Sequence, residues 1–355
     1  MRILYITSVL NRGGAEQQLY YLLKYLRPQP DVTVVSLGGT GHWEQAIKDL
    51  GVRVIPLKRK SKGDLSRLFE LMQIIRSGHY DIVHLWIDNV PGIYAHLAMF
   101  AVGHPRFITG ERADIYSQPG WYRRFKRVAN RRVKRVLCNS NATARNVIHE
   151  RLASASQVDY IPNGIELDRF TPKPTPSDTI TVGMVGSLSA VKNPEMFVRA
   201  AAKVIEIQPS VRFMHVGDGA MMDNMRQLAR DLEIADSLTF YGLREDIPKL
   251  LQQMDVFVLT SNSEGTPNAV MEAMAASLPC VTTNVGDCSG LITDDENGYL
   301  VPVGDIDQLA AVLLKLTKDA SLRRRMGQNS CERIQAYDVH RMAERYQVIY
   351  ADVLK

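Results

Sequence analysis

The chain has 355 residues, of which 45% are hydrophobic and 23% are charged. This composition excludes collagen-like, coiled-coil and disordered proteins, and the length suits two globular domains of ordinary size. The four cysteines form no CxxC pair, which favours reduced thiols in a cytosolic protein over a disulfide framework or a zinc site.

Charge divides the chain into two parts. Residues 1–172 carry 25 Lys and Arg against 14 Asp and Glu, a net charge of +11, whereas the remaining residues have a net charge of −6. We therefore expect two domains, only one of which faces an anionic partner.

The chain begins with ten largely apolar residues, MRILYITSVL, without a basic leader or a small-residue cleavage site. We expect a buried first strand here and not a signal peptide. The longest apolar stretch, residues 90–103, contains a histidine and two glycines, and it is too short and too polar to cross a bilayer.

Strand-like apolar runs then alternate with amphipathic helical stretches, the pattern of parallel βαβ units. The expected strands cover 3–9, 32–37, 52–57, 81–86, 106–110 and 135–140, and then 181–188, 211–217, 237–242, 256–261, 279–284 and 299–304. Between the two series, three prolines within 172–176 indicate a linker, because proline continues neither a helix nor a central strand. We predict an α/β fold with domains at 1–172 and 173–338 and a final helix at 339–355.

The segment TSNSEGTPNAVMEAMAASLPCVTTNVG, residues 260–286, is the most informative one. A helix is expected from about Pro267, because proline is well tolerated at the first helical position. Its N-terminus would offer backbone N–H groups to an anion such as a diphosphate; these belong to Gly265, Thr266, Asn268 and Ala269. Glu264 and Glu272 border the same place, where carboxylates accept hydrogen bonds from sugar or ribose hydroxyls. Taken alone, two such glutamates are more often ordinary surface residues.

Two further positions suit a phosphorylated ligand. Gly13 and Gly14, between the first strand and a helix, allow the backbone a close approach to a ligand, although such a pair is equally often a plain turn. Lys192 follows the first strand of the second domain and offers a point positive charge, or is simply a solvated loop lysine. The Asp305-Ile306-Asp307 motif resembles a metal site, but Asp305 is better placed as a helix N-cap, and we expect no metal.

Residues 120–136, GWYRRFKRVANRRVKRV, contain eight basic residues, three aromatic residues and no acid. A helix of this kind suits anionic lipid headgroups, which we favour over nucleic acid, and a solvated basic face is the remaining alternative. The residues expected to face a membrane are Trp121, Arg123, Arg124, Lys126 and Arg127.

The segment SEGTPNAVMEAMAASLPCVTTNVG resembles the E-x(7)-E region of family four glycosyltransferases. The resemblance also covers NRGGAEQQL, DIVHLW, CNSNAT, IPNGIELDRF, GSLSAVKNPE, HVGDG, YGLREDIPKLL and NGYLVPVGD, in the order of the family and over nearly the whole chain.

This resemblance implies a GT-B fold of two Rossmann-like domains facing a cleft, with the final helix crossing back onto the acceptor-side first domain. It also implies a retaining, metal-independent transferase that uses a nucleotide diphosphate sugar. Glu264 would contact donor-sugar hydroxyls, Glu272 the ribose and Lys192 the diphosphate. Gly13 and Gly14 would form the turn under the donor, and backbone groups near Arg244 would receive the base.

Two positions depart from the family pattern. Ser187 stands five residues before Lys192, where the family usually has an arginine, so the diphosphate charge falls on Lys192, the helix N-terminus and Arg244. The loop after residues 106–110 lacks the histidine that many relatives carry there. The acceptor-side candidates are therefore Glu111, Arg112 and Asp114 in that loop, and His84, although a histidine in an apolar strand is more often a core residue.

The predicted function is transfer of a hexose-type sugar to a lipid-linked glycan of the cell envelope, at the inner face of the cell membrane. The alternatives are a nucleotide-sugar isomerase of similar architecture and a non-catalytic member that binds the donor without turnover.

Overall fold

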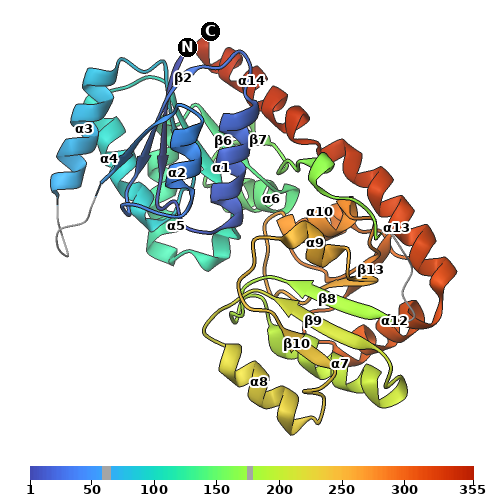
Figure 1. Cartoon of the computed structure of the whole chain (residues 1–355). Helices are drawn as coiled ribbons and strands as arrows, with labels where there is room; N and C mark the ends of the chain where they lie inside the picture. The colour runs from blue at the N-terminus through green and yellow to red at the C-terminus, as the bar shows by residue number, and fades with distance from the viewer. Residues whose placement is uncertain (58–64, 174–178) are drawn as a thin grey trace. The chain divides into compact units, whose positions relative to one another are not determined.

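The computed structural model describes residues 1–57, 65–173 and 179–355 (Figure 1). They form two compact units, one made of Met1–Gly164 with Val339–Lys355 and the other of Ile165–Asp338. The chain leaves the first unit after Gly164, ahead of the proline-rich stretch where the boundary was expected. Residues 174–178 of that stretch lie outside the described residues. No helix among the described residues combines the length and the apolar character needed to cross a bilayer.

The first unit contains a seven-stranded parallel sheet in the order β3-β2-β1-β4-β5-β6-β7. The six strands that the apolar runs predict are present. The seventh, β7, is only three residues long and has Asp159 at its centre, so no apolar run announces it. The strands are β1 (Arg2–Thr7), β2 (Asp31–Ser36), β3 (Arg53–Pro56), β4 (Ile82–Leu85), β5 (Phe107–Glu111), β6 (Arg135–Cys138) and β7 (Val158–Tyr160).

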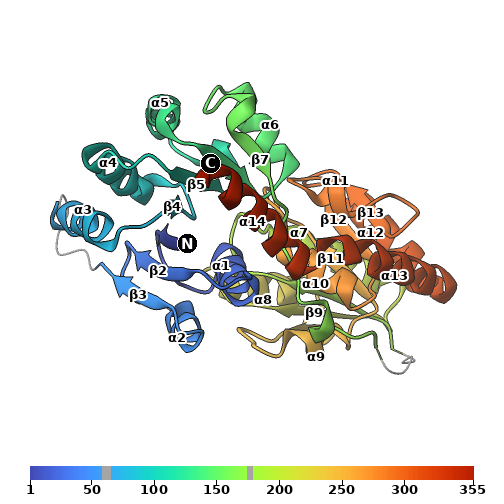
Figure 2. The ribbon, with the colours of Figure 1, turned by 90° about the horizontal axis from the view of Figure 1, so that it is seen from above.

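Helices cover both faces of this sheet (Figure 2). Ile3 and Tyr5 of β1 pack on one side, and Leu4 and Ile6 pack on the other, as expected for a parallel strand that is buried on both faces. One face is covered by α1 (Gly14–Tyr25), α2 (Trp43–Asp49) and α14 (Val339–Leu354). The other is covered by α3 (Ser66–Gly78), α4 (Ile93–Val102) and α6 (Asn141–His149), with α5 (Gly120–Ala129) beside α4.

The last helix of the chain, α14, completes the core of the first unit. Tyr346 and Tyr350 are buried in it, and the Tyr350 hydroxyl lies 2.8 Å from the hydroxyl of Tyr5 and 2.9 Å from Nδ1 of His84. Residues from both ends of the chain therefore share one core.

The second unit contains a six-stranded parallel sheet in the order β10-β9-β8-β11-β12-β13. All six strands expected in this part of the sequence are present: β8 (Thr181–Val185), β9 (Arg212–Val216), β10 (Leu238–Phe240), β11 (Val256–Leu259), β12 (Cys280–Thr283) and β13 (Gly298–Val301). Its helices are α7 (Pro194–Ile207), α8 (Met222–Asp231), α9 (Ile247–Leu251), α10 (Asn268–Ala275), α11 (Cys288–Leu291), α12 (Ile306–Lys318) and α13 (Ala320–Ile334).

Both sheets reverse their strand order beside the first strand. In the first unit β1 lies between β2 and β4, and in the second unit β8 lies between β9 and β11. Ligands of doubly wound α/β units bind outside the carboxyl ends of the strands at this reversal. The loops that follow β8 and β11 therefore mark the place to look for a site in the second unit.

Candidate active site

The loops after β8 and β11 bring together two residues that the sequence analysis selected. Nζ of Lys192 lies 2.5 Å from Oε1 of Glu264, and the Ser261 hydroxyl donates a hydrogen bond of 2.5 Å to the same oxygen. The side chains of Lys192 and Glu264 are 26% and 10% exposed, so the pair lies at the edge of the protein interior, open to a ligand on one side. Ser261 was not among the residues predicted from the sequence, although it precedes Glu264 by three residues.

Hydrogen bonds join the two loops to each other. The Asn262 backbone N–H donates to the carbonyl of Val191 at 2.7 Å, and its side-chain amide donates to the carbonyl of Ala190 at 2.8 Å. Thr260 Oγ1 donates to the carbonyl of Asn193 at 2.9 Å. The position of Lys192 relative to Glu264 is thus set by the backbone on both sides.

Two glycines allow the strands and loops around this pair to approach closely. Gly286 has a φ of +55°, and a Cβ there would collide with the carbonyl oxygens of Glu264 and Gly265. The next residue, Asp287, donates its N–H to the carbonyl of Gly265 at 2.9 Å. Gly217, with a φ of +137°, leaves no room for a side chain against the carbonyl of Gly186. Neither glycine was selected from the sequence, although Gly286 ends one of the family motifs and Gly217 lies within another, HVGDG.

Helix α10 begins at the expected place, with Pro267 as its N-cap and Asn268 as its first residue. Gly265, Thr266, Asn268 and Ala269 therefore lie at a helix N-terminus, where the helix dipole favours an anion. Glu272 lies within the first two turns and is partly exposed.

The other donor-side candidates occupy distinct environments. The Arg244 guanidinium is exposed and pairs with Asp246 through two hydrogen bonds of 2.8 and 2.7 Å. Ser187 is exposed, and its hydroxyl lies 3.0 Å from that of Ser189. In the first unit, Gly13 is the extended N-cap of α1 and Gly14 its first residue, directly after the loop that follows β1.

The predicted N-cap role of Asp305 is confirmed. Its carboxylate accepts a hydrogen bond of 2.9 Å from the backbone N–H of Gln308 at the start of α12. Asp307 instead pairs with Lys203 at 2.6 Å, so the two aspartates serve different contacts.

The structure corrects two of the four acceptor-side candidates. His84 is fully buried in β4, where its Nδ1 meets the Tyr350 hydroxyl, and burial holds its pKa well below the usual value. Glu111 is also buried, at the end of β5. Because neither side chain reaches the surface, neither is presented to an acceptor in this structure. His84 is thus a core residue, which is the commoner role of a histidine in an apolar strand.

The remaining two candidates hold the loop after β5. The Arg112 guanidinium lies over the Trp86 ring, 3.4 Å from its centroid, and donates hydrogen bonds to the Trp86 carbonyl and the Tyr346 hydroxyl. Asp114 is only partly buried, and its carboxylate accepts a hydrogen bond of 3.0 Å from the N–H of Tyr116. Of the two carboxylates among the four candidates, that of Asp114 is the one close to solvent.

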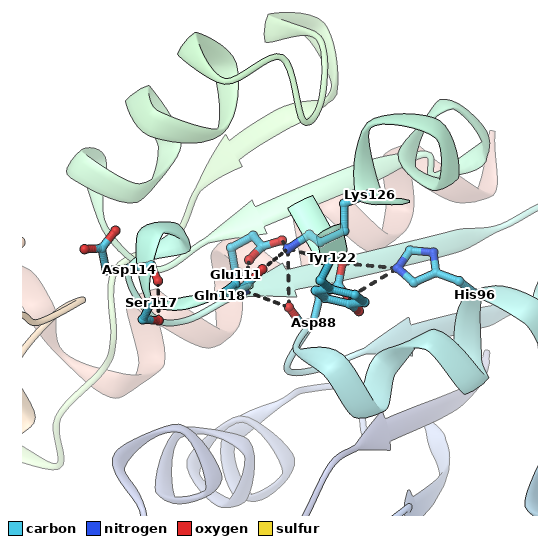
Figure 3. Close-up of polar contacts among 8 residues, drawn as sticks. All are labelled: Asp88, His96, Glu111, Asp114, Ser117, Gln118, Tyr122 and Lys126. Atoms are coloured by element: carbon cyan, nitrogen blue, oxygen red, sulfur yellow. Dashed lines mark hydrogen bonds and ion pairs between the residues drawn. The ribbon is translucent and has the colours of Figure 1, made fainter. Parts of the chain in front are cut away.

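Lys126 was wrongly expected to face a membrane. Its side chain is fully buried, forms an ion pair with Glu111 and lies 3.6 Å from an Asp88 oxygen (Figure 3). The Asp88 carboxylate also accepts a hydrogen bond of 2.7 Å from the Tyr122 hydroxyl and contacts Nε2 of His96 at 3.2 Å. A lysine buried between two carboxylates offsets part of their negative charge, so this position of α5 belongs to the core.

Ionisation within this cluster follows from burial and charge. Burial favours the neutral form of Asp88, but the Lys126 ammonium and His96 outweigh it and hold the pKa of that carboxyl below its usual value. Burial raises the pKa of Glu111, against the lowering effect of Lys126.

The other residues that were expected to face a membrane lie at the surface. Exposed side chains are those of Trp121, Arg124 and Arg127, and that of Arg123 is partly exposed.

Comparisons with known proteins identify the family of this fold. The model of Glycosyltransferase Family 4 matches residues 12–169, and that of Glycosyl transferases group 1 matches residues 168–333.

Curated relatives cover most of the chain. A UDP-Gal:alpha-D-GlcNAc-diphosphoundecaprenol alpha-1,3-galactosyltransferase of Escherichia coli is 28% identical over 315 residues, which cover 82% of this chain and 80% of that protein. The lipopolysaccharide core biosynthesis glycosyltransferase LpsE of Rhizobium meliloti is 28% identical over 330 residues, 90% of each protein.

The fold has solved counterparts. The crystal structure of Anabaena Alr3699/HepE in complex with UDP-glucose superposes with a TM-score of 0.89 at 22% identity, over 99% of this chain and 100% of that chain. Since the two family models together match residues 12–333 and both units have the expected Rossmann-like topology, the chain belongs to the family four glycosyltransferases and has the GT-B fold.

Proposed function

We propose that this glycosyltransferase moves a hexose-type sugar from a nucleotide diphosphate sugar to a lipid-linked glycan acceptor of the cell envelope, with retention of the anomeric configuration. The observation that carries the proposal is the Lys192–Glu264 pair at the strand-order reversal of the second unit, beside the N-terminus of α10. The names of the relatives support the choice of substrates, because the E. coli protein is named for UDP-Gal and a diphosphoundecaprenol acceptor.

The pair suggests how the donor is held. A donor diphosphate would bind at the N-terminus of α10 and attract the Lys192 ammonium. The Glu264 carboxylate, released from Lys192, would then accept hydrogen bonds from the sugar. Glu272 would accept hydrogen bonds from the ribose hydroxyls. Together the two positive groups would stabilise the charge that develops on the leaving diphosphate.

The proposed reaction needs no separate general base. The acceptor oxygen bonds to the anomeric carbon, the bond from that carbon to the diphosphate oxygen breaks, and the departing phosphate oxygen takes the acceptor proton. The products are the glycosylated acceptor and the free nucleotide diphosphate.

Product analysis tests this proposal against its alternatives. We expect nucleotide diphosphate release from UDP-hexoses only when an undecaprenol-diphosphate-linked sugar is added, with an α-linked product by NMR. Conversion of one nucleotide sugar into another without an acceptor would identify an isomerase. Donor binding without release of nucleotide diphosphate, whichever acceptor is added, would identify a non-catalytic member.

We further propose that no metal is required, so activity should persist in excess EDTA. Loss of activity in EDTA, with rescue by Mg²⁺ or Mn²⁺, would contradict this.

We also propose that the first unit rests on the anionic inner face of the cell membrane, where such an acceptor is presented. The exposed cations of α5 support this, since each contributes on the order of 1 kcal/mol near an anionic surface. The Arg123→Glu/Arg124→Glu variant should no longer co-sediment with phosphatidylglycerol-containing liposomes at low salt. Arg127 is left in place because it pairs with Glu150 at 3.1 Å. Failure of the wild-type protein to bind these liposomes would contradict the proposal.

A further inference from the structure

The first unit contains a cavity that the proposed transfer reaction does not use. It has a volume of about 820 Å³, within the range of small-molecule sites, and lies between α4 and α5. Its lining includes Pro105 and Phe107, where β5 begins, and Val133 and Lys134, directly before β6. The cavity therefore opens at the amino ends of these strands. Substrates of doubly wound sheets bind at the carboxyl ends, so this cavity is not part of the substrate site.

The inner wall of the cavity is apolar. Met99, Phe107 and Val133 are buried behind it. His96 also lines the cavity, but its Nε2 contacts the Asp88 carboxylate at 3.2 Å, and its ring packs edge-on against Phe107 and Phe125. Because Asp88 engages one ring nitrogen of His96 and two phenyl rings flank the imidazole, the wall suits a hydrocarbon better than a polar ligand.

Large apolar side chains continue this wall to the surface. Leu97 and Phe100 of α4 and Val128 of α5 line the cavity and are 42%, 62% and 63% exposed. A contiguous exposed apolar lining of this kind marks an interaction site on a folded protein.

The rim of the cavity is cationic. Arg131, Arg132 and Lys134 line it and are exposed, and none of them forms an ion pair with a carboxylate among the described residues. The Arg132 guanidinium lies 4.1 Å from the centroid of the Phe100 ring, which brings charge and apolar surface together at the entrance. No acidic residue occurs in the described lining.

We propose that this cavity binds the hydrocarbon chain of an anionic membrane lipid, with the lipid phosphate held by Arg131, Arg132 and Lys134. An apolar interior with a cationic rim complements a single chain that carries an anionic head. The proposal extends the membrane association proposed above by giving one lipid molecule a defined site, and it does not depend on the transfer chemistry.

Monomeric n-alkyl phosphates test the site without any membrane. Isothermal titration of the whole protein with chains of about 8 to 12 carbons, below their critical micelle concentrations, should give a Kd that tightens about fourfold for each added methylene. Inorganic phosphate should bind far more weakly than any of them. A Kd that does not depend on chain length, or equal binding of inorganic phosphate, would overturn the proposal.

Variants separate the interior from the rim. Ala129→Trp places an indole in the cavity and should abolish the dependence on chain length. Phe100→Ser changes an exposed side chain, so it preserves the fold and should weaken binding of the longer chains about tenfold. Arg131→Glu/Arg132→Glu should weaken every alkyl phosphate by about tenfold or more. Arg124→Glu, an exposed cation of α5 outside the cavity, should bind like the wild type.

The outcomes distinguish this proposal from the proposed function. Wild-type affinity in Ala129→Trp and Phe100→Ser together would remove the cavity from the argument even if liposome binding and glycosyl transfer are observed. Equal binding of uncharged n-alkyl alcohols would overturn the role of the rim. Conversely, binding of alkyl phosphates without any glycosyl transfer would leave the lipid site established and the proposed activity wrong.

Discussion

A single oxygen atom joins three residues of the candidate site. Oε1 of Glu264 contacts the Lys192 ammonium and the Ser261 hydroxyl, each at 2.5 Å. Lys192 is 72 positions away in the sequence, and only the pairing of β8 with β11 brings it to Glu264. The chemistry of the pair is therefore a property of the sheet topology as much as of the two side chains.

The proposed roles of the two glutamates predict different effects on nucleotide binding. Glu272→Ala should weaken UDP binding by roughly 1.5–3 kcal/mol, the range for a hydrogen bond to a charged group. Glu264→Gln should lower turnover strongly while UDP binds at least as tightly as in the wild type, because Lys192 loses its competing carboxylate. Titration calorimetry with UDP and steady-state kinetics measure both effects. Equal UDP affinity in the wild type and Glu272→Ala would contradict the ribose role.

The buried lysine of α5 predicts a large loss of stability. Lys126→Met would leave Glu111 and Asp88 without their cation and should lower the free energy of unfolding by about 3–5 kcal/mol. Arg124→Met, two positions earlier and exposed, is the matched control and should change it by less than about 0.5 kcal/mol. Urea unfolding followed by circular dichroism measures the difference. Similar values for the two variants would place Lys126 at the surface after all.

Within elements, strand β9 carries a histidine that has no polar contact with the described residues. Neither ring nitrogen of His215 forms a hydrogen bond to a described residue, and burial lowers its pKa to about 4. Between about pH 6.5 and pH 4, His215 is therefore protonated in the unfolded chain but neutral in the folded chain. The stabilising effect is fully present above pH 6.5 and is lost as the pH falls through this window.

Replacement of His215 should remove this pH dependence. Wild-type stability should fall by on the order of 3 kcal/mol from pH 7 to pH 4 through this residue alone, a loss that His215→Phe should lack. His149→Phe changes a histidine whose side chain is 80% exposed and should retain the wild-type dependence. Urea titrations at several pH values provide the comparison. Parallel curves for the wild type and His215→Phe would refute the expectation.

Apolar runs predicted the sheets well because strands buried on both faces are continuous in hydrophobicity. They missed β7, where Asp159 interrupts a three-residue strand at the edge of the sheet. The run of basic residues at 120–136 misplaced Lys126, because its carboxylate partners Asp88 and Glu111 belong to other elements and no local pattern marks them. The family resemblance predicted that Lys192 and Glu264 both contact the donor, but only the structure showed that they contact each other and that Ser261 joins them.

For the whole molecule, the main feature is that the first unit is discontinuous in sequence. Its core contains α14, which the chain reaches only after the entire second unit. Tyr350 is fully buried there and contacts Tyr5 and His84.

Loss of that contact should destabilise one unit and spare the other. Tyr350→Ala should lower the stability of the first unit by about 3–5 kcal/mol, the range for large aromatic truncations in a core. Val348→Ala, on the same helix but 70% exposed, should have little effect. Hydrogen exchange should accelerate in β4 and remain unchanged in β11. Equal acceleration in both strands would mean that the units do not unfold independently.

The position of α14 also has a consequence for biosynthesis. On the ribosome, the sheet of the first unit is synthesised first, but the helix that covers one of its faces is synthesised last. Domains generally fold as units while the chain grows, so the second unit has all its residues available before the first one does. Until then, the apolar side chains of β1 and α1 that α14 will cover remain without that partner. The N-terminal part of the nascent chain, although it is synthesised first, should therefore need protection by a chaperone for the longest time.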